Sequence, residues 1–119
     1  MEIIQKAIKK TGAEYYIKHL GIINPFLPLE LTPKEREVLG TFMSLEGETA
    51  KRDRFGTSFR KDVKAALNLS DGGLGNHLGA LQNKGAIYKE LDGTLHIKDY
   101  LFPEEGEQKY QFRLINNGV

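Results

Sequence analysis

The sequence contains no cysteine among its 119 residues. It therefore has no disulfide framework, no thiolate metal site and no cysteine nucleophile, and it is compatible with a reducing compartment. No apolar run is long enough to cross a bilayer. The lysines near the N-terminus are not followed by an apolar core, so we expect no signal peptide. These absences predict a cytoplasmic protein that makes no membrane contact.

A strong charge of one sign is also missing, because the net charge is only +1. The distribution is uneven. Residues 51–64 hold six basic side chains against two acidic ones, whereas acidic residues outnumber basic ones in residues 28–48 and 99–109. A basic centre of this kind is suited to docking an anion, although a solvated mixed surface has the same pattern. The length and the 39% apolar content predict one globular domain.

Catalytic and metal-binding patterns are absent as well. His19, His77 and His96 are scattered along the chain without the spacing of metal ligands. The glycines of residues 72–75 resemble a phosphate loop, but no Lys-Ser or Lys-Thr pair follows them. We therefore expect no enzyme activity, no cofactor and no metal site.

The first thirty residues predict a helical extension. Apolar residues recur at helical spacing over residues 2–10 and again over residues 13–20, with Gly21 placed to end the second helix. Residues 21–31 contain two X-Pro pairs but remain apolar, which predicts an extended strap across the core. We expect residues 1–30 to pack either on their own domain or on a second copy, forming a homodimer.

A second helix has a clear start signal. Thr32 is suited to the cap position, a proline follows it, and Glu35 lies three residues on, as a capping box requires. Gly47 is expected to end this helix. Residues 46–59 then predict a polar loop, in which the hydroxyl residues at 57–58 cap the next helix.

The centre of the chain predicts a helix, a turn, a helix and a hairpin. Residues 61–67 form the first amphipathic helix, and residues 71–84 form the second, between a serine cap and a terminating glycine. Strands are expected over residues 86–90 and 94–98, joined by a turn at an Asp-Gly pair. After this hairpin, residues 104–119 predict an acidic turn and a terminal strand, since residues 110–114 alternate between apolar and polar.

Four runs of this sequence resemble the winged helix-turn-helix superfamily, and within it the MarR-type regulators. The runs lie in residues 31–39, 61–70, 74–81 and 83–87. The resemblance implies an α+β, mainly helical fold over residues 31–103, with an N-terminal helical extension and a small antiparallel β-hairpin wing. It also implies that the helix over residues 71–84 enters a major groove while the hairpin flanks it.

The resemblance assigns candidate contacts to double-stranded DNA, in three groups. The basic residues before and within the first helix of the motif suit phosphates: Arg52, Arg54, Arg60, Lys61 and Lys64. The polar residues of the second helix suit base edges: Asn76, His77, Gln82 and Asn83. The wing contributes Lys89, His96 and Lys98.

Three features depart from this pattern. The second helix carries glycines at 72, 73, 75 and 79, each costing about 1 kcal/mol relative to alanine. Its polar face has no arginine for a bidentate contact to guanine. Acidic residues offset the lysines of the wing.

The leading hypothesis is a DNA-binding transcriptional regulator, expected to be a dimer. The alternatives are a protein-interaction subunit of a larger assembly, such as a transcription complex or a phage-like particle, and a replication module of plasmid or phage type.

Overall fold

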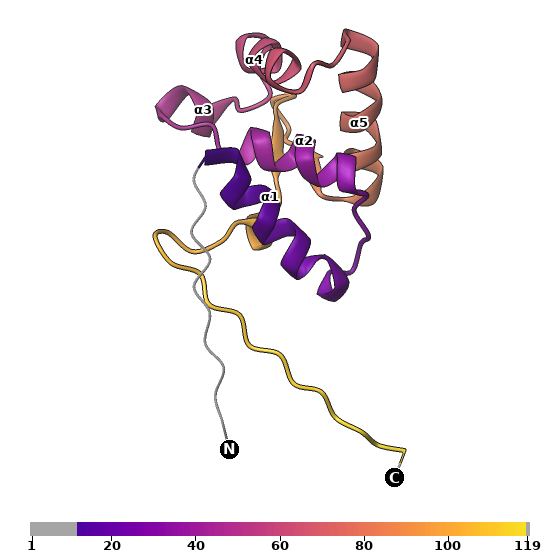
Figure 1. Cartoon of the computed structure of the whole chain (residues 1–119). Coiled ribbons are helices and arrows are strands. Elements are labelled where there is room, and N and C mark those ends of the chain that lie inside the picture. The colour runs from indigo at the N-terminus through magenta and orange to yellow at the C-terminus, as the bar shows by residue number, and fades with distance from the viewer. Residues whose placement is uncertain (1–11, 119) are drawn as a thin grey trace.

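The computed structural model of the chain describes residues 12–118 and shows an α+β fold that is mainly helical (Figure 1). The helix expected over residues 2–10 lies outside the described residues. The elements, in chain order, are α1 (Gly12–Ile23), η1 (Asn24–Phe26), α2 (Pro33–Met43), α3 (Glu48–Arg52), α4 (Thr57–Leu67), α5 (Asp71–Lys84), β1 (Ile87–Lys89), β2 (Leu95–Ile97) and η2 (Asp99–Leu101).

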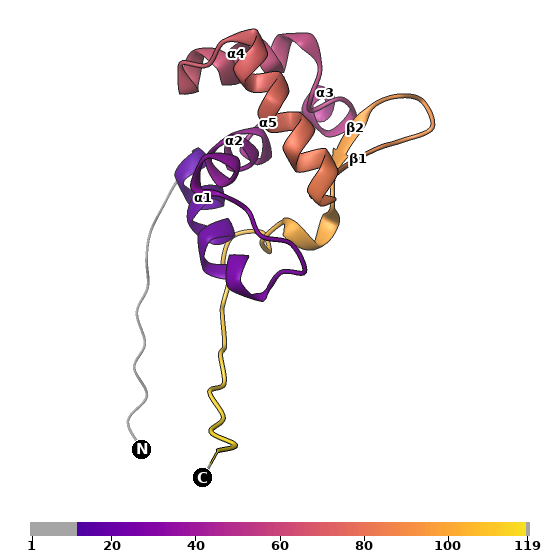
Figure 2. The same cartoon turned by 90° about the vertical axis from the view of Figure 1, so that its right-hand side faces the viewer.

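Helix α2 lies at the centre of the core. Its residues Val38, Leu39 and Phe42 are fully buried, and α1 packs along it in both views of the molecule (Figures 1 and 2). The two helices approach closely at Gly40, where a Cβ atom would lie 2.5 Å from Cγ1 of Ile17. Only glycine allows this approach without displacing a neighbour.

The start of α2 confirms the predicted capping box. The backbone N–H of Glu35 donates to Oγ1 of Thr32 (3.2 Å), and the backbone N–H of Thr32 donates to Oε1 of Glu35 (2.7 Å). The expected end at Gly47 is wrong, because the helix stops at Met43. The segment predicted as a polar loop contains the short helix α3, whose Ala50 is fully buried.

Helix α1 corrects two predictions about the N-terminal extension. It continues through Gly21 to Ile23, so Gly21 does not end it. Ile23 packs against the core, and this burial outweighs the low helix propensity of one glycine. The expected strap is therefore helical in its first part. Asn24 fixes the extended remainder, since its Oδ1 accepts a hydrogen bond from the backbone N–H of Leu31 (2.9 Å).

The two helices of the motif occur as predicted, but α4 begins earlier than expected. It begins at Thr57 after Gly56, and no side chain caps it, so the expected hydroxyl cap is wrong. The turn to α5 is closed by Asn68 in the left-handed conformation (φ 55°). The predicted cap of α5 is confirmed, because Oγ of Ser70 accepts from the backbone N–H of Gly73 (3.0 Å).

The hairpin follows α5 directly. Its strands β1 and β2 are antiparallel, with Ile87 opposite Ile97, and both are shorter than predicted. The terminal strand expected over residues 110–114 is wrong, because this segment pairs with no strand in the described part of the chain. It leaves the fold beside α1 and runs away from α4 and α5 (Figures 1 and 2).

Candidate functional site

Helix α5 turns one face to the core and one to solvent. Leu74, Leu78 and Leu81 are buried on the inner face. The predicted base-contacting residues Asn76, Gln82 and Asn83 are exposed, and their side chains form no hydrogen bond with the described residues. His77 differs, because it is only half-buried at the border of the two faces. Three of the four predicted base-edge residues are thus free to contact a partner.

A cleft of about 580 Å³ lies beside this face, between the start of α4, helix α5 and the hairpin. It brings together one residue from each predicted contact group, namely Arg60, Gln82 and Lys89. Gly75 and Gly79 form part of its wall, and a Cβ atom at either position would meet nothing within 4 Å. The absence of side chains at these two positions keeps the cleft open.

The charges in this cleft nearly cancel. Arg60 and Lys89 are offset by Asp53 and Asp92, which also line it. Hydrogen bonds from Thr94 hold the pKa of Asp92 below its usual value, so this carboxylate stays ionised. The sequence showed acidic residues in both the basic segment and the wing, but Asp53 and Asp92 are distant in the chain, and only the tertiary fold brings them into one cleft.

The predicted wing residues are divided between the two faces of the hairpin, because alternate strand residues point to opposite sides. Lys89 lies opposite Leu95 and lines the cleft. His96 lies opposite Tyr88 on the other face, and Nζ of Lys98 is 4.6 Å from the centroid of the Tyr88 ring. Only one of the three predicted wing residues therefore adjoins α5 through the cleft.

Arg54 has an internal structural role. Its Nη1 donates to the backbone carbonyls of Phe42 (2.9 Å), Met43 (3.3 Å) and Leu45 (2.9 Å), at the end of α2. The guanidinium carbon lies 5.3 Å from the centroid of the Phe102 ring. The carbonyl of Phe42 also accepts from the backbone N–H of Leu45 (3.2 Å), but Arg54 supplies donors for the carbonyls of Met43 and Leu45, which the end of the helix leaves without a backbone partner. We therefore remove Arg54 from the set of candidate phosphate contacts.

Two other basic residues are also engaged internally. Nζ of Lys64 bonds the carboxylate of Asp71 and so ties α4 to the first turn of α5. This hydrogen bond holds the pKa of Asp71 below its usual value. Nε of Arg60 donates to the carbonyl of Phe55 (2.6 Å), which leaves the rest of its guanidinium beside the cleft.

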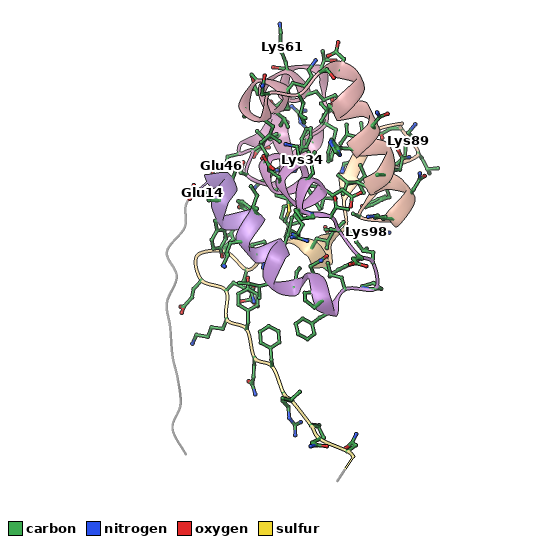
Figure 3. All side chains as sticks on the ribbon, turned by 45° about the vertical axis from the view of Figure 1, so that its right-hand side comes forward. Glu14, Lys34, Glu46, Lys61, Lys89 and Lys98 are labelled. Atoms are coloured by element: carbon green, nitrogen blue, oxygen red, sulfur yellow. The ribbon has the colours of Figure 1, made fainter. Side chains whose placement is uncertain are left out.

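The remaining predicted phosphate contacts, Arg52 and Lys61, are exposed. Lys61 projects from α4 at one end of the molecule, while Lys89 projects from the hairpin at its side (Figure 3). Lys61 and Lys89 are therefore well separated and do not form one dense basic patch.

The part of the chain that the structure describes contains no cluster of three or more His, Asp or Glu residues that could hold a metal ion. Among residues 12–118, no helix combines the length and apolar character needed to cross a bilayer. The chain shows no match to a protein-family model, to a curated protein or to a solved structure.

Proposed function

We propose that this chain is a winged helix that binds double-stranded DNA, with α5 as the recognition helix and β1–β2 as the wing. The observation that carries the proposal is the outer face of α5. It is exposed over its whole length, and its amide side chains are free to pair with base edges. Asn and Gln side chains pair well with adenine in the major groove.

Helix α4 and the turn at Asn68 support the same proposal. They precede α5 in the order that a helix-turn-helix requires, and the hairpin follows immediately. An exposed ion pair between Lys64 and Asp71 also bridges the two helices at the turn. Regulation of transcription is the role that we infer for such a domain.

The basic residues set the expected strength of binding. Arg54 and Lys64 are engaged internally. Arg60 and Lys89 line the cleft beside α5, and Lys61 projects from α4, so we take these three as the phosphate contacts; the exposed Arg52 lies on α3 and does not line the cleft. Three such contacts per protomer predict that affinity falls roughly 40-fold between roughly 50 and 200 mM salt. This dependence is shallow for a DNA-binding protein, so we expect moderate affinity for random sequences.

The proposal is tested by fluorescence anisotropy with a random-sequence duplex at these two salt concentrations. Lys61→Glu and Lys89→Glu should each weaken binding about tenfold or more at the lower salt concentration. Lys18→Glu is the matched control, because it makes the same change of charge at an exposed position on α1. Equal effects of all three variants, or no binding by the unmodified protein, would refute DNA binding through this face.

A second candidate function is contact with another protein. The cleft favours it, because two acidic and two basic residues line it (Asp53, Asp92, Arg60 and Lys89), so its net attraction for a polyanion is small. The exposed backbone at Gly75 also lets another surface approach α5 closely. A chain that binds no duplex at low salt would support this second function, as a subunit of a larger assembly.

A further inference from the structure

The C-terminal tail, residues 104–118, is extended and contacts the fold at three points, the first being a long hydrogen bond from the Tyr15 hydroxyl to the carbonyl of Glu104 (3.5 Å). The ring of His19 bonds the hydroxyl of Tyr110 through Nδ1 and the carbonyl of Leu101 through Nε2 (2.9 Å). Since a carbonyl only accepts, Nε2 carries the hydrogen, and the Tyr110 hydroxyl donates to Nδ1. Beyond this point the ring of Phe112 stacks on Phe26, with centroids 4.6 Å apart.

From Tyr110 onward the tail has the properties of a β-strand that lacks a partner strand. No backbone group of residues 110–115 forms a backbone hydrogen bond with another described residue. Phe112, Leu114 and Ile115 are 56%, 102% and 64% exposed, and Phe26, which stacks on Phe112, is 66% exposed. An extended segment with unpaired N–H and C=O groups and an apolar face is a template for strand pairing.

We propose that a second copy of this chain covers the tail, through antiparallel pairing of the two tails about a two-fold axis at Phe112. In this register Tyr110 lies opposite the partner's Leu114 on the apolar face. Gln111 lies opposite the partner's Arg113 on the polar face. On the face of Tyr110, Phe112 and Leu114, apolar residues thus meet apolar ones, and Arg113 is kept from facing its own copy. Ile115 lies on the other face, opposite the partner's Lys109.

The self-complementary register is the reason to choose a second copy as the occupant. A two-fold interface uses the same patch twice, and the apolar–polar pattern of the run from Tyr110 to Leu114 is the same in both directions. Placement supports the same choice, because the tail leaves the molecule on the side away from α4 and α5 (Figures 1 and 2). Pairing there leaves both copies of α5 and its cleft uncovered, whichever partner they bind.

The proposal is tested by sedimentation velocity over a range of protein concentrations, which measures dimerisation of the unmodified chain and of two variants that each add one negative charge. Leu114→Glu puts a carboxylate on the apolar face and should weaken the dimer about tenfold or more. Gln111→Glu puts the same charge opposite the partner's Arg113, so the dimer should be retained or tightened. Because both side chains are exposed, neither change should alter the circular dichroism spectrum of the protomer.

Two outcomes would overturn this dimer. One is a protein that stays monomeric at hundreds of micromolar. The other is a dimer that responds equally to Leu114→Glu and Gln111→Glu, because its interface would then lie elsewhere, for example in the N-terminal segment. Neither outcome bears on DNA binding, which the charge variants at Lys61 and Lys89 test separately.

Discussion

At the scale of single residues, Arg54 contributes to folding through one nitrogen that serves three carbonyls. Arg54→Met should lower the free energy of unfolding by about 1–3 kcal/mol, because buried carbonyls at the end of α2 lose their donor. Urea denaturation measures this change. Arg52→Met is the matched control, since the exposed Arg52 should change stability by less than about 0.5 kcal/mol. Equal stability of the two variants would contradict the structural role of Arg54.

Glu35 gives a second prediction at this scale. Burial raises the pKa of Glu35, but hydrogen bonds from Lys84 (2.6 Å) and from the backbone of Thr32 outweigh burial, so the net shift is downward. A lowered carboxyl pKa stabilises the fold above the unfolded-state pKa, and this contribution is lost as pH falls through the folded-state pKa. Glu35→Gln should therefore be less stable than the unmodified protein at neutral pH, by about 1–3 kcal/mol.

The pH dependence of this difference is the decisive measurement. Below the ordinary carboxyl pKa of 4.5, the unfolding free energies of Glu35→Gln and the unmodified protein should converge. Glu37→Gln, on the exposed side of the same helix, serves as the comparison. A stability difference that stayed constant from neutral to acid pH would show that the charge on Glu35 is not responsible.

At the scale of elements, the glycines of α2 and α5 predict opposite responses to the same substitution. Gly40→Ala should destabilise the protein by about 1–3 kcal/mol, because the added methyl group would overlap with Ile17 of α1. Gly75→Ala and Gly79→Ala should each stabilise it by up to about 1 kcal/mol, because open space surrounds both positions. Thermal unfolding of the three variants distinguishes these cases, and a shift of the same sign in all three would contradict the packing described.

Most elements could be predicted from local signals in the sequence. The capping box at Thr32, the serine cap of α5 and its terminating glycine are local hydrogen-bonding patterns, and the structure confirms all three. The predictions failed at elements whose extent depends on contacts with residues distant in the sequence. Helix α1 passes Gly21 because Ile23 packs in the core, and α3 forms because Ala50 is buried, neither of which is encoded in neighbouring residues.

The candidate site was less predictable than the fold. The exposed face of α5 follows from its leucine spacing, so Asn76, Gln82 and Asn83 lie where the sequence placed them. The positive charge of a residue did not reveal whether it contacts a binding partner or another part of the same fold. Arg54 and Lys64 are used inside the fold, through hydrogen bonds that only the tertiary structure brings into reach.

At the scale of the whole molecule, we expect the C-terminal tail to be needed for dimerisation but not for folding. A chain shortened to end at Pro103 keeps every residue of the hydrophobic core, so we expect it to fold. Its unfolding midpoint should be independent of protein concentration. The midpoint of the full chain should rise by a few degrees per tenfold increase in concentration, because dimerisation stabilises the folded state by mass action. Calorimetry of both chains checks this difference, and parallel behaviour would mean that the tail plays no part in association.

The glycines of α5 also have a consequence for the time course of amide exchange. The first turns of this helix hold Gly72, Gly73 and Gly75, and the ion pair of Asp71 with Lys64 there is exposed to solvent and therefore weak. Its last turn is fastened by the ion pair of Lys84 with the buried Glu35. The helix should therefore open from its N-terminal end, on a faster timescale than α2, and its early amides should exchange with deuterium first. A partner that seats on α5 would slow this exchange, and the protected amides would mark its footprint whether the partner is a duplex or another protein.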